Sequence, residues 1–182
     1  MDDGSRSPVV DRVLAEYTVR EPRVKLKVRE VNGGIVAASN AAVEMAAGEF
    51  VALLDHDDEL ADDALYYVVE TLHRRPELDI FYTDEDKIDE KGKRYDPFFK
   101  PDWSPDLLLS ENYIAHFLVA RRELLLAAGG FRPGFDGSQD YDLALRLTEQ
   151  SDRIAHISRV LYQLSSQSGD RESGRSGVPE PA

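Results

Sequence analysis

Residues 32–58 read NGGIVAASNAAVEMAAGEFVALLDHDD, which predicts a helix and then a strand that ends in an acidic motif. Residues 37–47 are rich in strong helix formers, and Gly48 is suited to end the helix. Residues 49–54 form a short continuous apolar run, which is typical of a strand buried on both faces. Ligands of open α/β sheets bind beyond the carboxyl ends of strands, so residues 55–58 are predicted to lie at a binding site.

Strand and helix patterns alternate along the rest of the chain. The predicted further strands are residues 79–83, 115–121 and 154–161, and the predicted further helices are 65–72, 123–128 and 139–149. This alternation predicts an α/β fold with a mostly parallel sheet flanked by helices. Residues 84–112 show no clean period, and a loop of that length inside a domain is usually functional or mobile.

The composition of the chain changes only near its C-terminal end. Residues 165–182 are rich in Ser, Gly and Pro, and we expect them to form a disordered tail because they cannot bury enough apolar surface. Residues 1–164 are predicted to form one globular domain. No apolar run approaches the roughly 20 residues that span a bilayer, and the first residues do not resemble a signal peptide.

The net charge of −13, from 35 acidic residues against 22 Lys and Arg, is concentrated in a few places. Residues 55–63, 84–90 and 136–142 together hold 14 acids and one base. This balance disfavours nucleic-acid binding and docking on an anionic membrane, because both require basic patches. The absence of Cys excludes disulfides and thiolate metal sites, and it favours a reducing compartment.

The acidic motif Asp-His-Asp-Asp at residues 55–58 is a candidate metal site. If the strand geometry persists, Asp55 and Asp57 project to the same side, where they must share a proton or be offset by a cation. Oxygen ligands without Cys favour Mg²⁺ or Mn²⁺. The alternative is a solvated loop that caps the next helix, and the residues alone leave both open.

Other acidic residues lie at similar positions. Asp84 and Asp86 follow another predicted strand, where a solvated turn is the alternative. Asp140 lies at a predicted helix start, where the dipole would keep it ionised, as a general base requires. Dipole complementarity alone also explains that position. Asp2 and Asp3 occur in a sequence typical of a turn.

The four histidines do not form a metal-binding pattern of their own. No pair has the i, i+4 spacing of a zinc-binding helix. His116 and His156 fall in predicted strands, where a lone histidine is more often a hydrogen-bonded core residue than a ligand.

Taken in order, these segments resemble the family 2 glycosyltransferases of the GT-A fold, and the resemblance runs from Asp2 to about Tyr162. The matching motifs are DDGS at residues 2–5, the helix and strand of residues 32–58 leading into a DxD motif, FYTDEDKID at 81–89, KPDWSPDLLLSENYIAH at 100–116, GGFRPGFDGSQDYDLALR at 129–146 and HISRVLY at 156–162. The later motifs resemble a bacterial subgroup associated with surface polysaccharide and antigen assembly.

The resemblance implies a role for each acidic residue of the donor side. Asp3 would contact the base or ribose of a nucleotide donor, with Asp2 beside it. Asp55 would approach the ribose, and Asp57 would coordinate a Mn²⁺ or Mg²⁺ ion on the diphosphate. Asp58 is a second candidate for the same ion.

The resemblance also implies roles on the acceptor side. Asp140 would be the general base of an inverting transfer, with Gln139 beside it where many relatives have Glu. The sugar and acceptor side would be lined by Asp84, Asp86, Asn112 and His116, and His156 is a weaker candidate for approaching the metal.

The implied activity is that of a hexosyltransferase-type glycosyltransferase that moves a sugar from a nucleotide-diphosphate donor to a saccharide or lipid-linked acceptor. The implied location is cytoplasmic, at the inner face of the membrane where the acceptor machinery is membrane-bound. The family pattern begins with a strand, a helix and a second strand before DDGS, and this sequence begins at DDGS. Two alternatives therefore remain: a truncated or degenerate domain with little turnover, and an acidic metal-binding or interaction module.

Overall fold

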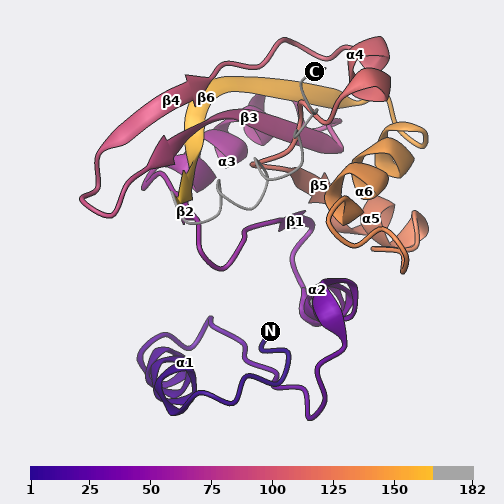
Figure 1. The fold of residues 1–182 in the computed structure, drawn as a ribbon. Coiled ribbons are helices and arrows are strands. Elements are labelled where there is room, and N and C mark those ends of the chain that lie inside the picture. The colour runs from indigo at the N-terminus through magenta and orange to yellow at the C-terminus, as the bar shows by residue number, and fades with distance from the viewer. Residues whose placement is uncertain (166–182) are drawn as a thin grey trace, which may run out of the picture.

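The computed structural model describes residues 1–165, which contain six helices and six strands (Figure 1). The helices are α1 Pro8–Arg20, α2 Gly34–Met45, α3 Ala64–Arg74, α4 Pro105–Ser110, α5 Arg122–Ala127 and α6 Gln139–Thr148. The strands are β1 Phe50–Ala52, β2 Glu59–Leu60, β3 Ile80–Ile88, β4 Arg94–Phe98, β5 Val119–Arg121 and β6 Ile154–Ser165. The predicted disordered tail lies outside the described residues, apart from Ser165, which ends β6.

The strands form one sheet in the order β1-β5-β3-β6-β2, with β4 paired to β3. The α/β class agrees with the sequence, but the expectation of a mostly parallel sheet is wrong. Among the pairings between named strands of residues 1–165, only that of β3 with β6 is parallel. Strand direction depends on how the connections turn, and a tight turn at residues 89–93 reverses the chain between β3 and β4.

Strand β3 is longer than the apolar run that predicted it. The predicted strand ended at residue 83, whereas β3 continues to Ile88 and is buried through Asp86. Strand β6 pairs with it along this extension, as far as Ile88 opposite Ser165. Asp84 and Asp86 therefore lie inside a strand and not in a turn beyond it. The predicted long loop of residues 84–112 is also corrected, because it contains the end of β3, β4 and α4.

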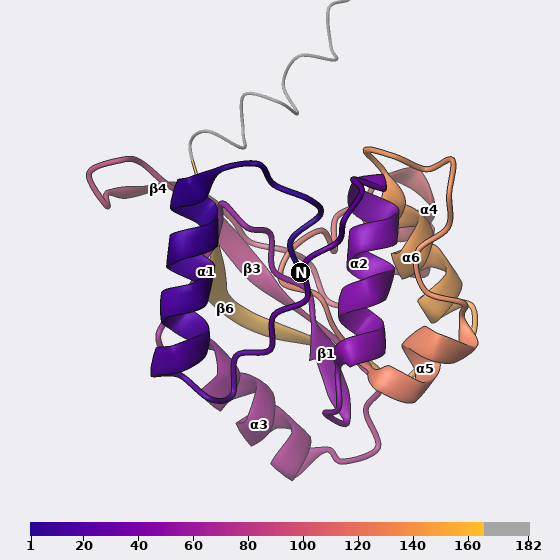
Figure 2. The same cartoon turned by 90° about the horizontal axis from the view of Figure 1, so that it is seen from below.

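Apolar side chains pack on both faces of the sheet. Ile80 and Tyr82 of β3 belong to a core cluster with α5 and α6, whereas Phe81 belongs to a second cluster with α3. This alternation follows from the two-residue repeat of a strand. Helices α4, α5 and α6 gather on the same side of the sheet in two perpendicular views (Figures 1 and 2), and α5 contacts β5.

Residues 1–33 pack less closely than the rest. Helix α1 contains no buried residue, and Val9, Val13 and Tyr17 are exposed along it. Within this segment, a parallel bridge joins Asp2 to Val28. None of the described helices combines the length and apolar character needed to cross a membrane.

The packing of α6 against the sheet gives a stability prediction. Leu143 of α6 is fully buried, and we expect Leu143→Ala to lower the free energy of unfolding by about 2–5 kcal/mol through lost burial and a residual cavity. Leu109→Ala is the matched control because that leucine on α4 is 73% exposed, and its effect should stay within about 0.5 kcal/mol. Urea unfolding of the two variants measures the difference, and equal losses would contradict this account of the core.

Candidate active site

A cavity of about 830 Å³ is formed by α2, β1, the segment that follows β1 and the start of α6. This volume falls in the range of small-molecule sites. Most of the wall is apolar, and its polar side chains are few: Ser39, Asp55, His116, Gln139 and Asp140. The fold therefore brings Asp55 and Asp140, which are 85 positions apart in the sequence, to the wall of one cavity.

Asp55, Asp58 and His116 form an acidic cluster at this cavity. Each offers one ligand atom, and these three atoms lie within 4.8 Å of one another. The cluster follows β1, where the sequence predicted a binding site. Within the described residues Asp57 is not part of this cluster, and its carboxylate lies 3.5 Å from His56 Nδ1.

Tyr162 of β6 supports the turn that carries the two aspartates. Its hydroxyl donates to Asp58 Oδ2 at 2.8 Å and accepts from the backbone N–H of Asp55 at 3.2 Å. The other oxygen of Asp58 accepts from the backbone N–H of Ser165 at 2.8 Å. The ring of Tyr162 also stacks on His116, with centroids 4.8 Å apart. Tyr162 occurs in the HISRVLY motif, but the sequence alone assigned it no role.

His116 lies between two carboxylates. Its Nε2 is 3.7 Å from Asp55 Oδ2, and its Nδ1 is 3.7 Å from Glu85 Oε2. Burial opposes protonation of the imidazole, but the two carboxylates outweigh that effect and raise the pKa of His116 to about 10. In turn, His116 holds the pKa of Asp55 below its usual range, against a smaller effect of desolvation. The imidazolium therefore offsets the charge of Asp55, and it shares Glu85 with the ammonium group of Lys100.

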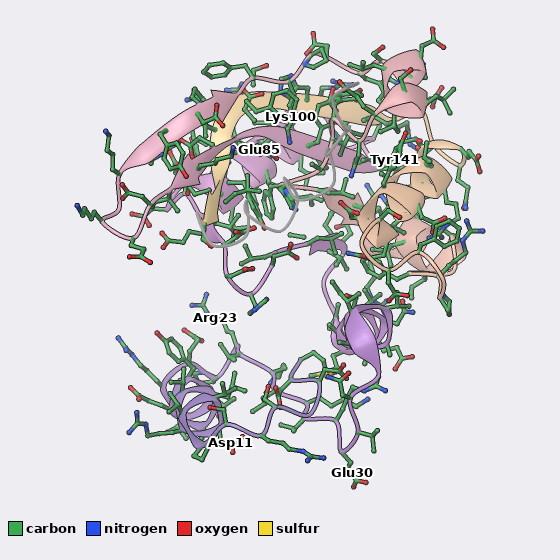
Figure 3. All side chains as sticks on the ribbon, in the orientation of Figure 1. Asp11, Arg23, Glu30, Glu85, Lys100 and Tyr141 are labelled. Carbon is green, nitrogen blue, oxygen red and sulfur yellow. The ribbon has the colours of Figure 1, made fainter. Side chains whose placement is uncertain are left out.

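Asp140 lies in the first turn of α6 and lines the cavity. Asn112 Nδ2 donates to Asp140 Oδ2 at 3.0 Å, and Asn112 Oδ1 accepts from the backbone N–H of Ala115 at 3.3 Å. Ser138 is the N-cap residue of α6, and its side chain makes no capping bond. The neighbouring Tyr141, labelled in Figure 3, donates its hydroxyl to the Leu108 carbonyl, which ties this turn to α4.

Asp2 and Asp3 lie in the turn that the sequence indicated. Asp2 is buried and its carboxylate accepts from the backbone N–H of Ser5 at 3.2 Å. The Asp3 carboxylate accepts from the backbone N–H groups of Gly33 and Gly34, and it pairs with Arg29 Nε at 2.9 Å. These bonds place Asp3 at the start of α2. Its contact with a nucleotide stays a prediction.

The remaining candidates lie in the sheet or beside the cavity. Asp84 is buried, and its Oδ1 accepts from the backbone N–H of Lys100 and lies 2.8 Å from His156 Nε2. Asp86 pairs with Arg94 Nε at 2.6 Å. The side chain of His156 is 4% exposed and lies outside the acidic cluster. The Gln139 amide oxygen accepts from the backbone N–H of Gly137 at 2.7 Å.

Solved structures show the same architecture. *Staphylococcus aureus* TarS 1–349 in complex with UDP superposes with a TM-score of 0.71 and 20% identity over 90% of this chain and 49% of that chain. The *Pyrobaculum calidifontis* mannosyltransferase PcManGT, in complex with GDP-Man and Mn²⁺, gives 0.60 and 19% over 88% of this chain and 45% of that chain. At these identities the likeness shows the fold alone, and that fold is GT-A-like, as the sequence predicted.

Sequence comparison shows the family. The model described as glycosyl transferase family 2 matches residues 1–127, and this chain belongs to that family. It is 47% identical over 180 residues to the uncharacterized protein y4gI of *Sinorhizobium fredii*, covering 98% of this chain and 20% of that protein. It is 43% identical over 178 residues to the O-antigen biosynthesis protein RfbC of *Myxococcus xanthus*, covering 98% of this chain and 14% of that protein. The chain thus spans a fifth or less of the length of these relatives.

Proposed function

We propose that this chain transfers a sugar from a nucleoside-diphosphate donor to a saccharide or lipid-linked acceptor in the synthesis of a cell-surface polysaccharide. The observation that carries the proposal is that Asp55 and Asp140 line the same cavity, and that Asp55 also belongs to the acidic cluster. Family membership, the O-antigen relative and the UDP complex of a structural neighbour support it. A lipid-linked acceptor would place the reaction at the cytoplasmic face of a membrane.

Asp140 is the proposed general base. Its carboxylate takes the proton of an acceptor hydroxyl as that oxygen forms a bond to the anomeric carbon. The bond from the anomeric carbon to the diphosphate oxygen breaks on the opposite face, so the configuration inverts and the nucleoside diphosphate leaves. Asn112 orients the carboxylate through its bond to Oδ2.

The acidic cluster fits a divalent cation through its oxygen donors. Asp55 and Asp58 supply the carboxylates that Mg²⁺ and Mn²⁺ prefer, and the bonds from Tyr162 and Ser165 hold Asp58 in place. His116 could join them only after losing its proton, because a protonated imidazole cannot be a ligand. When bound, the cation would stabilise negative charge on the departing diphosphate.

A thermal-shift experiment tests the donor site. UDP, GDP and dTDP are added to the chain with MnCl₂, with MgCl₂ or with EDTA. At about 100 times the dissociation constant, a bound nucleotide should raise Tm by about 5–10 °C, and only with a divalent cation.

The outcomes separate the alternatives. No shift with any nucleotide and either metal contradicts the proposed donor site. A shift with metal alone supports the acidic metal-binding module. Metal-dependent nucleotide binding without sugar transfer supports a domain that keeps the architecture but has little turnover.

A further inference from the structure

Lys100 is a buried lysine beside the candidate site, and its three ammonium donors are all used. Its side chain is 0% exposed. Nζ donates to Glu85 Oε2 at 2.8 Å, to the Ile114 carbonyl at 2.7 Å and to the His116 carbonyl. Lys100 and Glu85 lie together in the middle of the sheet region (Figure 3). An ammonium has three N–H donors, so it makes no further donor bond.

These bonds converge on the segment that ends in His116. Lys100 binds the carbonyls of Ile114 and His116, and Glu85 Oε2 accepts from the backbone N–H of His116 at 3.2 Å. The same Glu85 oxygen lies 3.7 Å from the imidazole Nδ1. The backbone of His116 is therefore held on both its N–H and its carbonyl, and its ring faces a carboxylate fixed by the same lysine.

An apolar side chain could fill the space of Lys100 without the cost of burying a charge. Buried ion pairs often give no more stability than well-packed apolar residues of similar volume. An apolar residue could not, however, bind two carbonyls and orient Glu85. The pair is thus better suited to fixing a geometry than to stabilising the fold.

We propose that Lys100 is a positioning residue, which acts through Glu85 and the 114–116 backbone to fix His116 against Asp55 in the acidic cluster. This inference rests on the proposed function for its effect on turnover, although the position of His116 can be measured without any activity. Misplacing a charged group of a site by a fraction of an ångström to about 1 Å weakens transition-state stabilisation more than ground-state binding.

Two variants test the proposal, and the second does so without leaving the charge of Lys100 buried and unpaired. Glu85→Gln keeps the shape of the side chain, and the double variant Lys100→Met/Glu85→Gln removes both charges of the pair. Asp79→Asn is the matched control: Asp79 is also buried and ion-paired, immediately before β3, and six residues along a strand place it about 20 Å from Glu85.

The first readout is side-chain NMR of the full chain labelled with ¹⁵N-histidine, at one fixed pH. The chain has four histidines, and His116→Gln assigns the signal of interest. Loss of the Glu85 charge alone would shift these signals, so the position of His116 is read from the nuclear Overhauser contacts between its ring and the ring of Tyr162, whose centroids lie 4.8 Å apart. We expect these contacts to weaken in both test variants and to persist in Asp79→Asn.

The second readout is sugar transfer. We expect kcat to fall about 10–100-fold in the double variant, with the donor KM changed less than about threefold. Asp79→Asn should keep kcat even if it lowers Tm. Unchanged contacts between the His116 and Tyr162 rings together with unchanged kcat in Glu85→Gln, or in a folded double variant, would overturn the proposal.

The proposed sugar transfer and the positioning role of Lys100 are contradicted by different results. A wild-type chain that transfers no sugar contradicts the proposed function, while the NMR comparison still decides whether Lys100 and Glu85 position His116. An active wild type whose test variants behave like Asp79→Asn contradicts only the role of Lys100.

Discussion

Asp140→Asn is expected to lower kcat of sugar transfer by about 10²–10⁴-fold while nucleotide binding persists. The amide keeps the size of the side chain and can still bond to Asn112, but it cannot accept the acceptor's proton at neutral pH. Asp140 is outside the acidic cluster, so metal-dependent binding should not depend on it. Turnover assays paired with nucleotide titrations separate the two effects.

Asp136→Asn is the matched control for that change. It removes the same charge from the same acidic stretch, but Asp136 is exposed and does not line the cavity. Its kcat should stay within about twofold of wild type. Near-full transfer by Asp140→Asn would place the general base elsewhere.

Asp55→Asn is expected to weaken metal-dependent nucleotide binding by about 10–100-fold or more. One carboxylate of the acidic cluster then becomes a neutral amide, which holds a divalent cation less well, and His116 loses the acid facing its Nε2. Calorimetric titration of UDP, GDP or dTDP with Mn²⁺ measures the change.

Asp57→Asn decides between the two assignments of the metal ligand. The resemblance assigns the ion to Asp57, whereas the cluster contains Asp55 and Asp58. We expect a loss below about threefold from Asp57→Asn. A loss as large as that from Asp55→Asn would return the ligand role to Asp57 and contradict the role of the cluster.

The parts of the site that depend on local pattern could be predicted from the sequence. The apolar run of residues 49–54 indicated a strand followed by acids, and α6 begins with Asp140 in its first turn. However, β1 covers only Phe50–Ala52 and none of these residues is buried, so the expected burial of this strand on both faces is wrong. These signals are short-range, because an apolar run and the start of a helix are both patterns of neighbouring residues, whereas burial depends on contacts far apart in the chain.

The supporting residues could not be predicted in the same way. Glu85 lies in an acidic run that is typical of a turn, and its burial in β3 depends on Lys100, 15 positions away. Tyr162 acts on Asp58 across 104 positions. The direction of the strands was not predicted for the same reason. Strand β5 pairs antiparallel with both β1 and β3, through contacts between residues far apart in the chain.

The bonds of the Tyr162 hydroxyl also have a consequence for shorter fragments of this chain. The family match covers residues 1–127, including Asp55 and Asp58, yet the bonds that hold this turn come from Tyr162 and Ser165. A fragment ending near residue 150 would carry both aspartates and Asp140 but none of those bonds. We therefore expect the acidic turn to have the shape described here only in a chain that includes β6.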